Sequence, residues 1–262
     1  MSKPKTHQFL RDFTIHVDPR YEIENHIVEY GMWEPHVVGA IQYLVEPGFV
    51  CADVGANAGY HSLAMAQRGA HVLAFEPDSE NFSRLTQNLH LNPQVVERVT
   101  LFKQGLSDKP GKLKVFQSGD QEHRGNSYLS ETVDPHKWTN TGCAEPEICS
   151  VSTLDEILNG GRIDFIKVDV EGMELEVLKG GKRSIERFSP SIIFESLMTE
   201  SEGPKSLAVQ EFLLPLGYHL FFVDREKYHL NPTLYPAFKN DTVAIHASKL
   251  AQYLHLMNVP TG

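Results

Sequence analysis

Short apolar runs alternate with amphipathic stretches along most of the chain, which is the pattern of buried strands and surface helices. The runs predicted as strands are residues 49–54, 71–75, 99–103, 113–116, 163–168, 191–194, 219–223 and 242–246. The stretches predicted as helices are residues 60–67, 78–91, 153–158, 173–187 and 207–216. This alternation predicts an α/β fold with a mainly parallel sheet and helices on both faces. Because no helix separates the last two strands, we expect them to form an antiparallel edge.

The beginning of the chain departs from this alternation. Apolar positions at helical spacing occupy residues 21–46 and are interrupted near Gly31 and Pro35. A Pro-Gly pair then closes the section. We therefore expect a helical lead-in at residues 1–47 that forms part of a substrate cap, and one main domain at residues 48–262.

A long polar segment interrupts the domain at residues 117–146. It is rich in Gly, Asn, Ser, His and Pro, and loops of this length in a compact domain are often functional lids. His123, Arg124 and His136 lie in this segment and are candidates for capping a substrate.

Composition narrows the classes of function. The 262 residues suffice for one large domain, and 41% apolar with 22% charged residues is ordinary for a globular protein. The net charge of −10 argues against sequence-independent binding of nucleic acid, because such binding needs clustered basic residues. No apolar run approaches the ~18 residues of a membrane span, and the first residues lack the apolar region of a secretory signal. Three cysteines without CxxC spacing indicate reduced thiols, so we expect a cytoplasmic protein.

The stretch DVGANAG, residues 53–59, turns from a predicted strand into a predicted helix. Gly55 and Gly59 permit a tight turn and the close approach of a ligand. The turn lacks the GxGxxG of nicotinamide-binding proteins, and Tyr60 and His61 stand where a P-loop has Lys and Ser or Thr. The ligand is therefore expected to be neither a dinucleotide nor a nucleoside triphosphate.

Asp53, at the end of the first strand, indicates which ligand the turn binds. A pyrophosphate would be repelled by this carboxylate, whereas an amine or a sulfonium would be attracted. S-adenosylmethionine (SAM) carries both cations. Glu76 ends the next strand about 20 residues beyond the turn, where an acid can accept hydrogen bonds from both ribose hydroxyls. The two acids and the glycines therefore favour SAM.

Four segments together resemble one known family. They are DVGANAGYHSLAMA, AFEPDSENFSRLTQNLHLN, GLSD and IDFIKVDVEGMELEVLKGG, which occur in order and with fitting spacing between Gly48 and Glu195. On these segments the chain resembles the FkbM family of SAM-dependent methyltransferases. The resemblance implies a Rossmann-like class I methyltransferase fold, with a mainly parallel seven-stranded sheet and an antiparallel edge strand. It also implies SAM as the cofactor and O-methylation of a hydroxyl on a sugar, a secondary metabolite or another small molecule.

The resemblance implies a set of cofactor-binding residues as well. Asp53 and the glycine turn would line the methionine end of SAM, Glu76 would bind its ribose, and the GLSD segment would lie near the adenine. The expected set is Asp53, Gly55, Asn57, Gly59, Glu76, Pro77, Ser107 and Asp108. Trp33 and Glu34 resemble an aromatic-acid element that precedes the glycine motif in the family. The resemblance implies that they close over SAM or the substrate, with packing in the core as the alternative for Trp33. The lead-in and the polar segment match the family less well, so we expect them to select the substrate.

The segment FIKVDVEGMELEVL places Asp169 and Glu171 at the end of a strand, beside the expected methyl group. Two close carboxylates tend to split their pKa values, which leaves one better suited as a base. A hydroxyl loses its proton as it is methylated, so both acids are candidate catalytic bases, with hydrogen bonding to the loop backbone as the structural alternative. Glu174 and Glu176 fall in the first helical turn, where the helix dipole favours acids. We expect Lys167 to point to the opposite face of the strand as a partly exposed structural cation.

Two further side chains complete the candidate catalytic set. Glu195 ends the strand in IIFES at the same sheet edge, and His61 follows the glycine turn in the first helical turn. No HxxxH or clustered DxD spacing supports a metal site, so we expect none. The chain has DVEG where amino methyltransferases of nucleobases typically have an N/D-P-P-Y/F motif, which again argues against nucleic acid as the partner.

Two other functions remain open from the residues alone. A non-catalytic protein that only binds SAM needs the same turn, and a nucleotide-linked oxidoreductase shares the fold but not the glycine spacing. The sequence also leaves open the acceptor, the choice between O- and N-methylation, and the oligomeric state.

Overall fold

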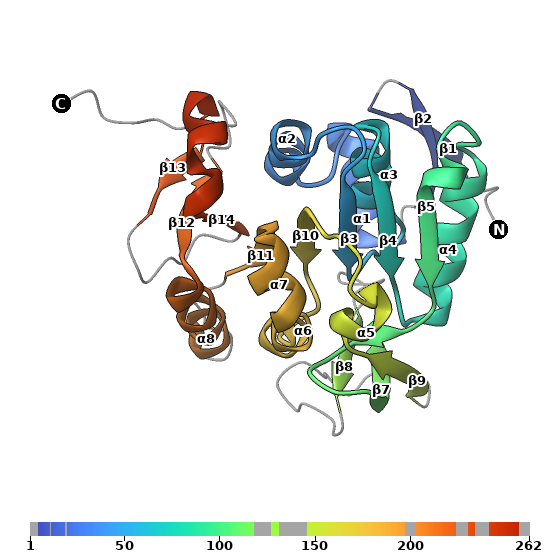
Figure 1. Ribbon diagram of the computed structural model, residues 1–262. Coiled ribbons are helices and arrows are strands. Elements are labelled where there is room, and N and C mark those ends of the chain that lie inside the picture. Colours follow the sequence, from blue (N-terminus) through green and yellow to red (C-terminus); the bar gives the residue numbers. More distant parts are fainter. Residues whose placement is uncertain are drawn as a thin grey trace.

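The computed structural model describes residues 5–10, 12–18, 20–117, 127–130, 146–196, 203–223, 230–233 and 241–256. Within these ranges, the main sheet has eight strands in the order β13-β12-β14-β11-β10-β3-β4-β5 (Figure 1). The strands are β3 (Val50–Val54), β4 (His71–Phe75), β5 (Val99–Phe102), β10 (Phe165–Val168), β11 (Ser191–Glu195), β12 (Tyr218–Val223), β13 (Leu230–Pro232) and β14 (Asp241–His246). From β5 to β11 the strands run parallel, so their C-terminal ends share one edge. The predicted α/β fold with a mainly parallel sheet is confirmed.

The strands beyond β11 in the described sheet all pair antiparallel, including the edge strand β13 with β12, so the predicted antiparallel edge is present. β14 pairs antiparallel with β11 on one side and with β12 on the other, and β13 forms the edge in the described part. Apolar residues occupy both faces of β14, as expected for a strand covered on both sides. The pattern of apolar residues identifies a strand, but it does not say between which neighbours the strand inserts.

Helices cover both faces of the sheet (Figure 1). One hydrophobic cluster joins the sheet to α2 (Pro35–Leu44), α3 (Tyr60–Gln67) and α4 (Ser79–His90). A second cluster joins it to α5 (Leu154–Leu158), α6 (Glu174–Gly180), α7 (Lys182–Phe188) and α8 (Gly203–Leu213). Short 3-10 helices lie at η1 (Val96–Arg98), η2 (Leu214–Leu216) and η3 (Ala247–Leu256). In the described ranges, no helix has the length and apolar character to cross a bilayer.

The predicted helix at residues 173–187 is divided into α6 and α7. The break falls at Gly181, which ends one helix and begins the other. A Cβ on Gly181 would lie 2.9 Å from Cδ2 of Leu154, so close packing against α5 occupies the space beside the break.

The lead-in contains a hairpin that the sequence pattern did not predict. β1 (Lys5–Phe9) pairs antiparallel with β2 (Phe13–Val17), and α1 (Glu22–Tyr30) and α2 follow. Alternate residues of β2 are buried in the same hydrophobic cluster as α3 and α4. The lead-in therefore shares a core with the rest of the chain, and a domain division at residue 47 stays a prediction.

A second, smaller sheet lies at the C-terminal ends of β3 and β4 (Figure 1). Its order is β6-β9-β7-β8, with β6 (Gly105–Leu106), β7 (Gly111–Gln117), β8 (Ser127–Ser130) and β9 (Glu147–Ser152). Only β7 was predicted, and β8 lies inside the segment expected to be a polar loop. His123, Arg124 and His136 of that segment lie outside the described residues.

Candidate active site

A cavity of about 410 Å³ lies at the C-terminal edge of the main sheet. Ligands of parallel α/β folds bind at this edge, and the volume is in the range of small-molecule sites. One side of the cavity, which we name the sheet-edge wall, consists of Gly55–Asn57, Glu76–Pro77, Asp169–Glu171 and Glu195. A second part of the lining, which we name the lead-in wall, consists of Glu22, Ile23, Trp33 and Glu34.

The glycine turn packs closely against its neighbours. Gly55 has φ +82°, and a Cβ at this position would lie 1.8 Å from the backbone oxygen of Asp169. Gly59 has φ +90°, and a Cβ there would lie 2.5 Å from Cδ1 of Leu85 on α4. The absence of a side chain thus lets the turn contact the end of β10 and the helix α4. Of the two glycines, Gly55 also lines the cavity.

Glu76 connects the glycine turn to the end of β4. Its carboxylate accepts hydrogen bonds from the backbone N–H groups of Asn57, at 2.8 Å, and Asp78, at 2.9 Å. Burial raises the pKa of Glu76 to about 8, although the two backbone donors act in the opposite direction. Asn57 and Pro77 line the cavity beside it. The structure brings these three expected residues together, and their contact with a cofactor stays a prediction.

Asp53 lies behind the sheet-edge wall. Its side chain is 0% exposed, and the described residues that line the cavity do not include it. Its Oδ2 accepts a hydrogen bond from Ser62 Oγ at 2.5 Å, and its Oδ1 lies 3.9 Å from Lys167 Nζ. Burial raises the pKa of Asp53, while Lys167 and Ser62 lower it. Ser62 and Lys167 thus contact this carboxylate inside the protein, and among the described residues its buried Oδ1 has no hydrogen-bond partner.

Lys167 is a member of the site, and the expectation of an exposed lysine on the opposite face is wrong. The residue is 3% exposed, lines the cavity, and donates a hydrogen bond from Nζ to Asp169 Oδ2 at 3.0 Å. Burial disfavours the charged amine, but the carboxylates of Asp169 and Asp53 raise the pKa of Lys167. Residues two apart on a strand share a face, so strand alternation places Lys167 with Asp169.

Glu174 fixes the loop that carries Glu171. Its Oε1 accepts hydrogen bonds from the backbone N–H groups of Val170 and Gly172, both at 3.1 Å. Glu171 lies between these donors with φ +55°, an uncommon backbone conformation for a residue other than glycine. Glu174 thus supplies two hydrogen bonds to the loop backbone, and Glu171 lines the cavity.

Glu195 lies in an unusually acidic environment. Burial and then the carboxylates of Asp169 and Glu171 raise the pKa of Glu195 to about 9. Asp241, which pairs with Glu195 across β11 and β14, adds to this effect and lies 2.5 Å from His36 Nε2. Glu195 is therefore protonated at neutral pH and can donate a hydrogen bond. Within the described ranges, no group of three or more His, Cys, Asp or Glu side chains is arranged to hold a metal ion.

His61 connects the sheet-edge wall to the lead-in wall. It is 6% exposed and lines the cavity, and its Nε2 lies 3.5 Å from Glu34 Oε2. Burial, then Lys167 and His36, lower the pKa of His61 well below its ordinary value. The imidazole is therefore neutral at physiological pH.

Ser107 and Asp108 line a neighbouring cavity rather than this one. That cavity has a volume of about 540 Å³ and shares Tyr128, Leu129 and Glu171 with the first. The two residues just before Ser107 line the first cavity instead. The GLSD segment thus lies in the expected region. Its glycine and leucine line the first cavity, whereas its serine and aspartate, which were expected there, line the second.

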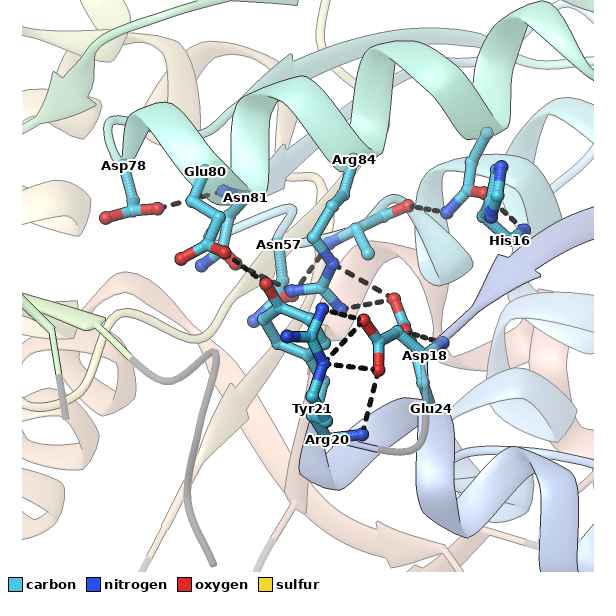
Figure 2. Close-up of polar contacts among 12 residues, drawn as sticks. His16, Asp18, Arg20, Tyr21, Glu24, Asn57, Asp78, Glu80, Asn81 and Arg84 are labelled. Carbon is cyan, nitrogen blue, oxygen red and sulfur yellow. Dashed lines mark hydrogen bonds and ion pairs between the residues drawn. The ribbon is translucent and has the colours of Figure 1, made fainter. Parts of the chain in front are cut away.

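Polar side chains join the lead-in to α4, as Figure 2 shows. Glu24 on α1 is buried and forms an ion pair with Arg84 on α4. Tyr21 donates a hydrogen bond to Glu80, and the Arg84 guanidinium lies 3.8 Å from the centre of the Tyr21 ring. This buried network, on the same segment as the lead-in wall, positions that wall against the cavity.

Sequence reasoning did not assign several of the lining residues. Lys167 could have been found by counting strand alternation back from Asp169. Tyr60 was noted only as a departure from the P-loop pattern, and Glu22 and Ile23 of α1 carry no motif. Tyr128 on β8 falls in a segment whose composition indicates a loop, so its place at the cavity depends on the second sheet.

Comparison with known proteins identifies the family. Residues 53–220 match the family model described as the methyltransferase FkbM domain. This match covers more than half of the chain, so the protein belongs to the FkbM methyltransferase family. The resemblance found in the sequence is confirmed.

Curated relatives match over part of their length. The chain is 32% identical over 152 residues to hexuronic acid methyltransferase AglP of Haloferax volcanii, which covers 56% of each protein. It is 34% identical over 155 residues to methyltransferase sdnD of Sordaria araneosa, covering 49% of this chain and 58% of that protein. It is 27% identical over 165 residues to 2-O-methyltransferase NoeI of Sinorhizobium fredii, covering 55% of this chain and 62% of that protein. The chain therefore spans less than two thirds of the length of these relatives.

A solved structure shares the fold. The crystal structure of a methyltransferase FkbM from Methylobacillus flagellatus matches with a TM-score of 0.50 at 17% identity, over 88% of this chain and 62% of that chain. The fold is thus that of class I methyltransferases, as predicted.

Proposed function

We propose that this protein is a SAM-dependent methyltransferase that methylates a hydroxyl group of a sugar or another small molecule. The observation that carries the proposal is the cavity at the sheet edge, where Glu76 lies at one strand end and the Lys167–Asp169 pair at another. The family membership supports the reaction class. The printed names of two relatives, a hexuronic acid methyltransferase and a 2-O-methyltransferase, support a sugar-like acceptor and an oxygen nucleophile.

The residues of the cavity suit SAM. Six of its described lining residues are carboxylic acids, from both walls, and one is a lysine. With Glu76 and Glu195 protonated at neutral pH, the other acids still outnumber the lysine, which favours a ligand that carries an ammonium and a sulfonium over one that carries phosphates. We assign Glu76 to the ribose hydroxyls and the turn at Gly55–Asn57 to the cofactor, with Asp53 supporting the turn from behind. When bound, SAM supplies an electrophilic methyl group.

Asp169 is the residue we assign as the base. Its Oδ2 is held by Lys167 at 3.0 Å, so Oδ1 is the atom assigned to accept the proton of the acceptor hydroxyl. Lys167 supplies a fixed counter-charge for this carboxylate. Glu195, protonated at neutral pH, donates a hydrogen bond that orients the acceptor. Glu171 and His61 complete the wall and help to exclude water.

The same observations favour a small-molecule partner. The net charge of −10 and the acidic cavity disfavour nucleic acid. We also propose a cytoplasmic location, in keeping with the free buried thiols of Cys51 and Cys149.

Calorimetric titration with SAM, S-adenosylhomocysteine and NAD⁺ tests the cofactor. We expect binding of the first two and none of NAD⁺. Formation of S-adenosylhomocysteine from SAM is then measured with glucuronic acid, methyl glucoside and methylamine as acceptors. Turnover with a hydroxyl acceptor supports the proposal. Binding of NAD⁺ alone contradicts the cofactor, and turnover with methylamine alone contradicts the oxygen acceptor.

A further inference from the structure

The two oxygens of the Asp53 carboxylate have different surroundings. Oδ2 accepts a hydrogen bond from Ser62 Oγ on α3 at 2.5 Å. The other oxygen, Oδ1, is buried, and among the residues that the structure describes it has no hydrogen-bond partner. A buried carboxylate oxygen without a donor is unfavourable, so its place beside the cavity asks for a functional reason.

The ammonium group of Lys167 lies next to this oxygen. Lys167 on β10 pairs in register with Asp53 on the parallel neighbour β3, so the two side chains leave the same face of the sheet. Nζ lies 3.9 Å from Asp53 Oδ1, which is beyond hydrogen-bond distance, and 3.0 Å from Asp169 Oδ2. A shift of about 1 Å would bring one of the three ammonium donors within hydrogen-bond distance of Asp53.

The two carboxylates beside Lys167 differ in exposure. The side chain of Asp53 is 0% exposed, whereas that of Asp169 is 36% exposed and lines the cavity. Burial disfavours the charged amine, but the carboxylates of Asp169, then Asp53, then Glu34 raise the pKa of Lys167. Lys167 therefore stays charged, and it needs a carboxylate partner throughout the reaction because a buried cation without a counter-charge is strongly unfavourable.

Methyl transfer removes the charge of one partner only. The acceptor oxygen bonds to the methyl carbon, the carbon–sulfur bond breaks, and its electron pair stays on the sulfur. The hydroxyl proton passes to Asp169 Oδ1, so Asp169 becomes neutral and attracts Lys167 less. Asp53 is outside the cavity and takes no part in this transfer. Although burial raises the pKa of Asp53, Lys167 and Ser62 both favour its charged form.

We propose that Asp53 is a positioning residue that accepts a hydrogen bond from Lys167 when Asp169 takes up the proton of the acceptor. Lys167 keeps its charge and its place in the wall, and only the carboxylate to which it donates changes. The proton then leaves the partly exposed Asp169 for water. The proposal rests on the proposed function, since it takes Asp169 as the base. It gives Asp53 a part in methyl transfer in place of the cofactor contact expected from the sequence.

A crystal structure of the full-length Asp169→Asn variant tests the position of Lys167 directly. The amide has the shape of the carboxylic acid but no charge, so it imitates the protonated state of Asp169. Lys167 Nζ should lie within about 3.2 Å of Asp53 Oδ1 in this variant. In the unsubstituted protein it should donate to Asp169. If Lys167 stays on the side chain at position 169, or turns to Glu34, the inference is overturned.

The Asp53→Asn variant tests the consequence for the reaction, with the hydroxyl acceptor that the unsubstituted protein methylates. Its kcat should fall by about 10- to 100-fold, the usual effect of losing a hydrogen bond to a charged group. Affinity for S-adenosylhomocysteine, measured by calorimetry, should stay close to that of the unsubstituted protein, because Asp53 does not line the cavity. This affinity also shows that the variant is folded.

Ser62→Ala is the matched control. It removes the donor to Oδ2 of the same carboxylate and leaves the charge that faces Lys167, so kcat should stay close to that of the unsubstituted protein. Equal losses of kcat in the two variants would overturn the inference, because Asp53 would then act by holding α3. Lost S-adenosylhomocysteine affinity with unchanged kcat in Asp53→Asn would also overturn it and restore the cofactor contact.

The proposed function fails by a separate result. If the unsubstituted protein binds neither SAM nor S-adenosylhomocysteine, the cofactor assignment is wrong. The position of Lys167 in the Asp169→Asn crystal structure is measured without either ligand, so it still decides whether Asp53 takes over the hydrogen bond.

Discussion

The two walls of the cavity are held in place in different ways. The sheet-edge wall continues directly from parallel strands and is fixed by backbone hydrogen bonds. Phe75 O accepts from the N–H groups of Gly55 and Ala56, and Val54 O accepts from Asp169 N–H at 3.0 Å. The lead-in wall is fixed largely by side chains, among them the Glu24–Arg84 pair.

This difference has consequences for substitution. A backbone hydrogen bond between strands survives most changes of side chain. A buried ion pair is lost when one partner changes, and the remaining charge is left uncompensated. We therefore expect that replacing the acids of the sheet-edge wall lowers mainly kcat. Replacing the side chains that hold the lead-in should lower mainly the free energy of unfolding.

The largest effect is expected on the sheet-edge wall, from Asp169→Asn. Removing the base should lower kcat by about 10²–10⁴-fold, the usual contribution of a general base. Affinity for S-adenosylhomocysteine, measured by calorimetry, should change far less, because backbone hydrogen bonds keep the wall in place. Glu171→Gln is the comparison, and it should retain more activity. A greater loss in Glu171→Gln would assign the base to Glu171 instead.

In the lead-in segment that carries the lead-in wall, Glu24→Gln should cause the largest loss of stability. It leaves the Arg84 guanidinium, whose side chain is only 11% exposed, without its counter-charge, which costs roughly 3–5 kcal/mol. Thermal unfolding should show a Tm lower by about 10 °C. Lys182→Ala removes an exposed pair with Glu186 and should change stability by only about 0.5 kcal/mol. Similar Tm values for the two variants would mean that the Glu24–Arg84 pair does not hold the lead-in.

Within the glycine turn, two alanine substitutions should differ. Gly55→Ala places a Cβ against the backbone oxygen of Asp169, which cannot move without shifting β10, so we expect a loss of about 2–4 kcal/mol. Gly59→Ala meets the end of the flexible Leu85 side chain, so we expect a loss of only about 1–2 kcal/mol. Urea unfolding of both variants measures the difference. Equal losses would indicate that positive φ, common to both glycines, dominates over the contacts.

A further prediction for the sheet-edge wall is a pH dependence of stability at Glu195. Its pKa is raised from 4.5 to about 9 by folding, so between these pH values the folded protein holds a proton that the unfolded chain releases. Stability from this group is thus greatest at low pH and falls as pH rises toward 9. The Glu195→Gln variant cannot lose this proton, so its stability does not fall in the same way. The Tm of the variant minus that of the unsubstituted protein should therefore increase from pH 5 to pH 8.5. A pH-independent difference would contradict the raised pKa.

The sequence by itself determined many elements of the main sheet and the position of the glycine turn. Helix α3 and strand β4 begin and end at the predicted residues, 60–67 and 71–75, because each is a short segment with a clear periodicity and turn signals at both ends. The glycine turn and Glu76 were placed correctly at the sheet edge, since the ends of parallel strands necessarily meet there.

Only the tertiary structure decided which of these residues face the cavity. The insertion of β14 between β11 and β12, the burial of Asp53 against Lys167, and the arrival of Glu34 from the lead-in all depend on pairs of segments far apart in the chain. Periodicity along a chain records burial at each position but carries no information on the partner that buries it. The positions of several acids near the site could therefore be predicted from the sequence. Which of them are buried within the protein and which line the cavity depends on the packing of the whole fold.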